Sequence, residues 1–257
     1  MTTNKKDNIL FEIPLNNRAR SLLRLERIFK ETSRYIEIAT PSAHYYVLKQ
    51  IFILIEFFDR GDFKAEIIKA LDKEIAYFAK LKNNPAVDLS KLQVFIKQLD
   101  QLNRWAKTQR GKLGNQLLKD EFLAAAQKRL NLPSARLSFD APNVKLFLTM
   151  DIDYRKKRLR EWMKTFKGVQ TTIEVILRLR RETGRDETVF AEDGHYQEEM
   201  KKDQYQFIAI TLPSAALIYP EVSTGSSRFS IHFKQLDETL TSQPFERWFD
   251  FQLTRYR

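Results

Sequence analysis

The apolar residues change their spacing part-way along the chain, and this change constrains the fold more than any other feature. Up to about residue 130 they recur at helical spacing, and from residue 186 onward they mostly alternate with polar residues. The first spacing is typical of amphipathic helices and the second of strands with one buried face. Helices followed by strands favour an α+β fold with a helical part and a β part.

The two predicted parts interleave along the chain. A helical domain is predicted over residues 16–133 and 152–183, and a β domain over residues 9–15, 134–150 and 186–257. The short apolar run at 9–15 alternates like a strand, so we expect it to join the C-terminal strands. The helices, with short connections, would then form an antiparallel bundle inserted between elements of a mainly antiparallel β domain.

Capping residues indicate where individual helices begin and end. Thr40-Pro41 is typical of an N-cap followed by proline at the first helical position. Gly61 is expected in the left-handed conformation that ends this buried helix. Residues 134–150 are interpreted as strand, because they alternate on both sides of Pro142; a short helix capped by Asp140 is the alternative.

The sequence offers little that could carry out catalysis. Its 257 residues include no cysteine, and its three histidines, His44, His195 and His232, are scattered. No serine-hydrolase, metalloprotease or Walker-type motif occurs. Asp193-Gly194 before His195 is interpreted as a turn, and the serine- and glycine-rich stretch 223–228 as a hairpin loop. An enzyme is therefore disfavoured, and no metal or cofactor is predicted.

No segment is predicted to direct the chain into or across a membrane. The first eight residues, MTTNKKDN, are polar and are not followed by an apolar signal segment. The longest apolar run, residues 45–58, is interrupted by Lys49, Gln50 and Glu56, so it is too short and too charged to span a bilayer. We expect a cytoplasmic protein.

The formal net charge of +11 points to an acidic partner, which could be nucleic acid, an anionic membrane surface or an acidic protein segment. A basic surface that is merely solvated is the alternative. Basic residues gather in three places, which are the arginines at 18, 20, 24 and 27, the run 155–160, and the arginines at 178, 180 and 181. Arg20, Arg24 and Arg27 would share one helix face, with pairing to Glu26 and Glu31 as the simpler explanation.

Two further features argue against a general DNA-coating surface. The segment 186–203 is rich in Asp and Glu, so the basic helices share the chain with an acidic hairpin. Trp105 and Trp162 lie among apolar neighbours and are expected to be core residues and not base-stacking platforms. No helix-turn-helix, zinc-finger or RNA-recognition signature occurs.

Short motifs from residue 9 to about 237 resemble, in the same order, those of the ZapD family of cell division proteins. These motifs are Leu10-Phe11-Glu12, Pro14-Leu15-Asn16, Arg20, Leu23-Arg24 with Glu26, Phe58-Asp59-Arg60-Gly61, Arg129-Leu130 with Pro133, Ser138-Phe139-Asp140 with Pro142, Tyr219-Pro220 and Ser227-Arg228-Phe229. The resemblance covers nearly the whole chain and rests on the order of the motifs taken together.

The resemblance implies a non-enzymatic adaptor that acts at midcell. It implies a symmetric homodimer that binds the C-terminal tail of FtsZ and bundles FtsZ filaments. The basic residues that it suggests for tail binding are Arg20, Arg24, Arg60, Lys145 and Arg228, with Lys145 standing where relatives carry histidine. Two departures from the family pattern are Glu121 and His232, which replace arginines of relatives. A nucleic-acid- or anionic-membrane-binding protein is kept as the alternative.

Overall fold

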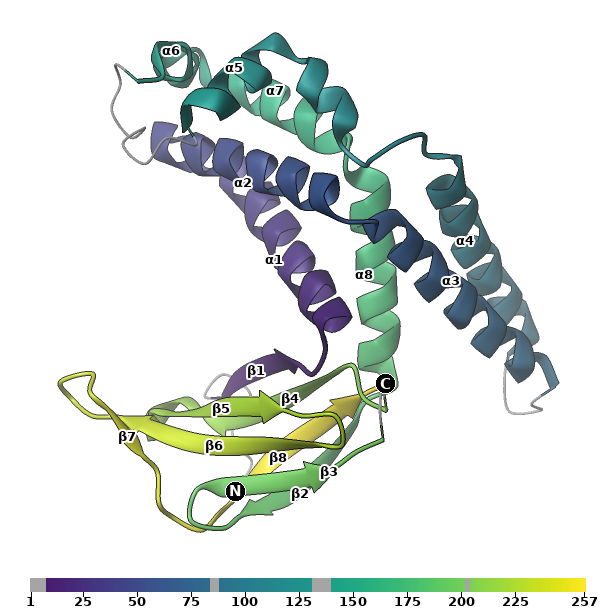
Figure 1. Ribbon diagram of the computed structural model, residues 1–257, viewed down its shortest axis with the longest axis vertical. Helices are drawn as coiled ribbons and strands as arrows, with labels where there is room; N and C mark the ends of the chain where they lie inside the picture. Colours follow the sequence, from purple (N-terminus) through teal and green to yellow (C-terminus); the bar gives the residue numbers. More distant parts are fainter. Residues whose placement is uncertain (1–7, 84–87, 131–139, 202–203) are drawn as a thin grey trace. The chain divides into compact units, whose positions relative to one another are not determined.

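The computed structural model describes residues 8–83, 88–130, 140–201 and 204–257. Within these ranges the chain forms helices and two antiparallel sheets, so the predicted α+β fold is confirmed (Figure 1). The chain divides into two compact units. We call Leu25–Ile176 the helical unit, and Met1–Arg24 together with Leu177–Arg257 the β unit.

The elements follow one another with mostly short connections. The helices are α1 (Asn17–Glu37), α2 (Pro41–Arg60), α3 (Phe63–Lys80), α4 (Leu89–Thr108), α5 (Glu121–Leu130), α6 (Pro142–Thr149), α7 (Ile152–Lys164) and α8 (Lys167–Glu182), with 3-10 turns at Leu81–Asn83, Asn115–Lys119 and Ser214–Ala216. The strands are β1 (Asn8–Pro14), β2 (Arg185–Ala191), β3 (His195–Glu199), β4 (Phe207–Pro213), β5 (Ile218–Thr224), β6 (Arg228–Leu236), β7 (Ser242–Pro244) and β8 (Phe249–Tyr256).

The β unit contains two sheets that share one core. The first sheet has the order β1-β4-β8-β2 and the second the order β3-β6-β5, with β7 beside β6. Alternate residues of both sheets, such as Ile210, Phe233 and Phe251, are buried together in this core. β1 pairs with β4, so the expectation that the N-terminal strand joins the C-terminal strands is confirmed.

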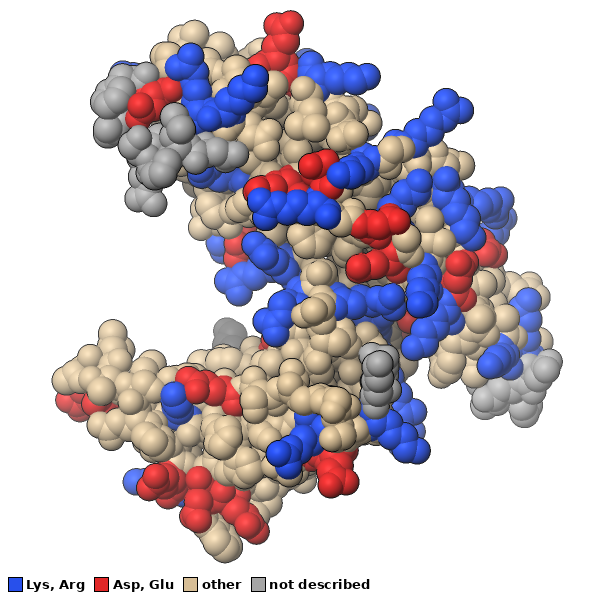
Figure 2. All heavy atoms as spheres, in the orientation of Figure 1, with Lys and Arg blue, Asp and Glu red and all other residues tan. Residues whose placement is uncertain are grey.

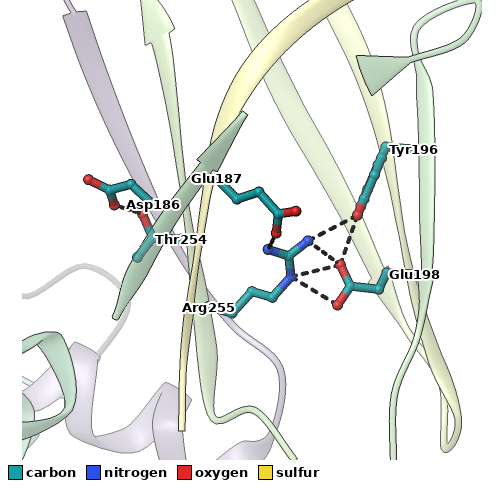
Figure 3. Close-up of polar contacts among 6 residues, drawn as sticks. All are labelled: Asp186, Glu187, Tyr196, Glu198, Thr254 and Arg255. Atoms are coloured by element: carbon teal, nitrogen blue, oxygen red, sulfur yellow. Dashed lines mark hydrogen bonds and ion pairs between the residues drawn. The ribbon is translucent and has the colours of Figure 1, made fainter. Parts of the chain in front are cut away.

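A polar cluster joins the two sheets beside this core (Figure 3). Arg255 of β8 donates through Nε to both carboxylate oxygens of Glu198 on β3, at 2.9 and 2.8 Å. Its Nη1 donates to Glu187 of β2 at 2.6 Å, and its Nη2 to the Tyr196 hydroxyl at 3.1 Å. Burial, followed by the Glu198 carboxylate, raises the pKa of Tyr196 to about 12. The partly buried guanidinium is thus satisfied by strands of both sheets.

In the helical unit, α2 is the central element. Nine of its residues are buried, and Phe58 packs against Phe63 and Phe166 with ring centroids 5.6 and 5.7 Å away. Trp162 is buried and stacks on Phe122. Trp105 lies so close to Gly168 that a Cβ there would come within 2.1 Å of the indole ring. Trp162 is therefore a core residue, as expected, whereas Trp105 is partly buried against Gly168 of α8.

Two local predictions are wrong. Residues 142–149, which are predicted as strand, form helix α6, because Pro142 suits the first helical turn and Val144 and Phe147 are buried at helical spacing. Ala141 and not Asp140 occupies its N-cap position, and the remainder of the predicted strand, 134–139, lies outside the described residues. Gly61 is extended, with φ of −133°, and not left-handed.

Other boundaries agree with the sequence. The Thr40 side chain accepts a hydrogen bond from the Ala43 amide, which caps α2 as predicted. Asp193-Gly194 forms the turn between β2 and β3, and residues 223–228 hold the β5–β6 connection.

The sequence pattern does not predict β5, because Pro220 is typical of a break in a strand. In the structure β5 is an edge strand, where proline is tolerated.

Candidate functional site

Arg20, Arg24 and Arg27 form the arginine face of α1. Two of these three guanidinium groups have no ion-pair partner among the described residues. Asn16 caps the helix through a 2.9 Å hydrogen bond from the Ala19 amide, and buried side chains such as Leu22 fix the opposite face in the core. Arg20 and Arg24 are exposed. Neither forms an ion pair with any residue that the structure describes. Two like charges one turn apart cost a few tenths of a kcal/mol, so an external anion would relieve this repulsion.

Arg27, the third arginine of the predicted face, is already paired. Its Nε donates to Glu31 at 2.9 Å, and the hydroxyl of Tyr46 donates to the other oxygen of the same carboxylate at 2.6 Å. The bond from Tyr46, followed by that from Arg27, lowers the pKa of Glu31. Burial and the Glu31 carboxylate in turn raise the pKa of Tyr46 to about 12. The simpler explanation of pairing therefore holds for Arg27 and not for Arg20 or Arg24.

Three of the five cations in the basic run 155–160 form ion pairs within the helical unit. Arg160 donates to both oxygens of Glu37, at 2.7 and 2.9 Å, and Lys156 lies 3.6 Å from the same carboxylate. Arg158 pairs with Asp120 and Glu161 at 3.1 and 3.0 Å. In Figure 2, basic and acidic side chains accordingly lie interleaved over the helical unit.

The cluster at 178–181 is also engaged. Arg181 of α8 pairs with Glu12 of β1 through two 2.8 Å hydrogen bonds. Arg178 lies 3.8 Å from Glu182, and Arg180 is buried. Two of the three basic clusters thus serve mainly to hold elements of their own unit together, which leaves α1 as the richest source of free cations among them.

The other predicted site residues lie on separate elements. Arg60 is the last residue of α2 and is paired with Glu56 one turn earlier. Lys145 is exposed on α6, which lies beside the first part of α2, so these two cations are at opposite ends of that helix (Figure 1). Arg228 is exposed at the start of β6, opposite Glu199 of β3. The helical unit does not bring Arg60 and Lys145 together.

The two departures from the family pattern are both at the surface. Glu121 is exposed at the first position of α5. His232 is exposed on β6, where its ring lies 4.6 Å from that of His195 across the β3–β6 pair. Within the described part of the chain, neither residue forms a hydrogen bond, ion pair or ring contact with a predicted site cation.

Sequence reasoning did not single out two cations further along α1. Lys30 and Arg34 are exposed, and the Arg34 guanidinium lies 5.1 Å from the centre of the Tyr35 ring. Arg34 lies seven residues after Arg27, so continuing the same helical spacing by two turns would have found it. With these residues the basic face runs along most of α1.

No group of three or more potential metal ligands occurs among the described residues. No described helix is both long enough and apolar enough to cross a bilayer. His44 is buried and donates through Nε2 to the Ile36 carbonyl at 3.1 Å, and its burial lowers its pKa.

Comparison with known proteins gives the chain a family. A family model described as "ZapD: Cell division protein" matches residues 23–232. The chain belongs to the ZapD family. The Cell division protein ZapD of Azoarcus sp. (strain BH72) is 28% identical over 246 residues, which cover 96% of this chain and 98% of that protein. The Cell division protein ZapD of Ralstonia pickettii (strain 12J) is also 28% identical over 246 residues, covering 95% of this chain and 98% of that protein. Family membership supports a role in cell division.

Proposed function

We propose that this protein is a non-enzymatic cell-division adaptor. It forms a symmetric homodimer in the cytoplasm at midcell, binds the C-terminal tail of FtsZ and cross-links FtsZ filaments into bundles. Membership of the ZapD family over most of the chain is the observation that carries this proposal. The exposed arginines of α1 support it, because they offer positive charge that the described part of the chain does not neutralise.

In this mechanism the tail is recognised through its acidic and apolar residues. Arg20 and Arg24 provide planar guanidinium groups, which grip carboxylates with two parallel hydrogen bonds. Arg60, Lys145 and Arg228 add positive charge that attracts the tail and speeds association. Each single contact is weak, but a dimer that holds two tails on neighbouring filaments gains about 10²–10⁴ in avidity. Peptide binding is thereby converted into cross-linking.

The test is binding of a fluorescently labelled FtsZ tail peptide, measured by anisotropy at rising salt. We expect saturable binding that weakens with salt, because the contacts are between exposed charges. Reversing the charge with Arg20→Glu and Arg24→Glu should remove most of the binding and abolish bundling in a sedimentation assay. Arg104→Glu, at an exposed position on α4, is the matched control and should bind like the unchanged protein.

Two results would contradict the proposal. Unchanged bundling by both arginine variants would show that the α1 face is not the site. Absence of peptide binding at low salt by the folded protein would mean that the tail is not its partner.

A further inference from the structure

The acidic hairpin at 186–203 is not used by the proposed function, and one of its side chains forms an exposed aromatic pair with a residue next to β8. Phe190 of β2 is 45% exposed, and Trp248, which directly precedes β8, is 63% exposed. Their rings pack edge to face with centroids 5.6 Å apart. Val189 packs into the core between the sheets, so alternation places Phe190 on the outer face of the first sheet. Aromatic side chains in this position are typical anchors for a partner.

The aromatic pair is held in place by the β2–β3 turn. The Trp248 indole donates to Asp193 at 2.6 Å. The Gly194 amide donates to the Arg247 carbonyl at 2.9 Å, and its carbonyl accepts from the Phe233 amide at 2.8 Å. A Cβ on Gly194 would lie 1.9 Å from the Phe245 carbonyl oxygen, so the turn and the segment before β8 are in close contact. Because the pair is already ordered, a partner would lose little free energy in ordering it.

β2 also offers a free edge. It is the outermost strand of the order β1-β4-β8-β2, and β3, which follows it, belongs to the other sheet. The two strands separate after the bridge between Glu192 and His195. No described strand pairs with the second side of β2, so an extended peptide has room to add a strand there.

The negative charge around the β2 edge favours a basic peptide. Glu192, Glu246 and Asp250 are exposed and form no ion pair with described residues, while Arg247 is the one exposed base in the segment 245–250. Figure 2 shows acidic side chains gathered at the edge of the β unit where the hairpin lies. In a chain of net charge +11, this surface has the opposite sign to the whole.

We propose that the β2 edge binds an extended basic segment of a partner protein. The segment adds a strand to β2, places an apolar side chain against Phe190 and Trp248, and directs Lys or Arg side chains toward Glu192 and its acidic neighbours. A second copy of this chain is a poorer occupant, because antiparallel pairing of two β2 edges would bring two acidic hairpins together. This surface and its partner are separate from the tail-binding face of α1.

The probe is a fluorescently labelled octapeptide of alternating lysine and leucine, added to the full chain at low salt. Saturable binding is expected even though the protein and the peptide are both cationic. Trp248 is the exposed tryptophan, so its emission should change and it should become shielded from iodide quenching. The same peptide with every second backbone nitrogen methylated should bind at least about tenfold more weakly, because it cannot complete the strand pairing.

Variants separate this surface from the rest of the molecule. Trp248→Ser and the double change Glu192→Lys with Asp250→Lys should each weaken octapeptide binding at least about tenfold. Glu238→Lys, at an exposed position between β6 and β7, is the charge-matched control and should leave it within about twofold. All variants should bind the FtsZ tail peptide like the unchanged protein. Absence of saturable octapeptide binding, equal binding of the methylated peptide, or a change of oligomeric state in the edge variants would overturn the proposal.

Discussion

An arginine withdrawn from solvent requires acceptors for its N–H groups, and Arg255 and Arg155 differ in how far this requirement is met. Arg255 has its side chain 14% exposed and donates to Glu187, Glu198 and Tyr196. Arg155 is 4% exposed, and its Nε and Nη1 have no hydrogen-bond partner among the described residues. Burial holds the pKa of His44 below its usual value; the hydrogen bond to the Ile36 carbonyl opposes this shift, and the charge of Arg155 adds to it. Arg255 therefore helps to hold the two sheets together. Arg155, in contrast, has N–H groups without acceptors among the described residues.

The first prediction concerns the two carboxylates that pair with Arg255. The Glu198 side chain is 19% exposed and that of Glu187 is 62% exposed. Replacing Glu198 by alanine leaves a partly buried guanidinium without its main acceptor, so we expect the free energy of unfolding to fall by about 2 kcal/mol. Glu187→Ala, the matched control, should cost less than about 1 kcal/mol. Urea unfolding measures both values, and equal costs would contradict the assigned roles.

The second prediction concerns pH. The pKa of Tyr196 is raised from 10.0 to about 12 in the folded state, so between these values the folded chain keeps a proton that the unfolded chain has lost. Stability must therefore be fully present below pH 10 and fall as the pH rises toward 12, by up to about 1.4 kcal/mol per pH unit.

The effect of Tyr196 is isolated by comparison with Tyr196→Phe. The difference in the free energy of unfolding between the two proteins should change between pH 10 and 12, and a constant difference would exclude the raised pKa. Tyrosinate absorbance provides an independent measurement, since one fewer late-titrating tyrosine should be seen in the variant.

At the scale of elements, the carboxylate of Asp120 links two helices. Asp120 accepts a hydrogen bond from the Leu123 amide at 3.0 Å, which caps α5. Its second oxygen accepts from Arg158 at 3.1 Å and from the Trp162 indole at 2.9 Å, both on α7. The start of α5 is thereby fixed to the buried face of α7.

The third prediction compares the stability lost on removing Asp120 with that lost on removing Asp88, an exposed helix cap. Asp120→Ala removes the cap and leaves the buried Trp162 N–H without this acceptor, so we expect a loss of about 2–4 kcal/mol in the free energy of unfolding. Asp88→Ala removes an exposed cap of α4 and should cost about 1 kcal/mol. Chemical unfolding followed by tryptophan fluorescence measures both. A cost for Asp120→Ala no greater than that for Asp88→Ala would show that the link to α7 adds nothing.

Most elements could be predicted from local chemistry, and the failures have physical causes. The start of α2 follows from Thr40 and Pro41, whose effects are local. The segment 142–149 has apolar residues that fit either period, and burial of Val144 and Phe147 in the helical unit decides between them. Such tertiary contacts are not encoded in the spacing alone.

The same reasoning applies to the candidate site. The spacing of Arg20, Arg24 and Arg27 predicts a shared face, but it does not tell which arginine is neutralised. That depends on Tyr46, which lies on another helix and orients Glu31 toward Arg27. For the run 155–160 the acceptors come from positions distant in the sequence, including Glu37, so a sequence pattern alone overstates its free charge.

At the scale of the whole molecule, net charge is a poor guide to the partner. The chain carries +11, yet three of the five cations in the run 155–160 and two of the three in the cluster at 178–181 are held in ion pairs. The nucleic-acid or membrane alternative rests on those two clusters, and engaged cations release few counterions from a polyanion. The arrangement instead favours a partner that needs only a few free guanidinium groups, which suits a short acidic tail.

The final prediction tests whether bundling depends on many weak tail contacts. If a dimer joins two tails, a free tail peptide competes for each site singly and gains none of the avidity of filaments, about 10²–10⁴. Preformed bundles should therefore dissolve when the free peptide greatly exceeds its own dissociation constant, as followed by light scattering and sedimentation. A tail peptide with its acidic side chains replaced by serine should leave the bundles intact, because it cannot engage the arginine face. Bundles that persist at saturating free peptide would show that filaments are joined through another surface.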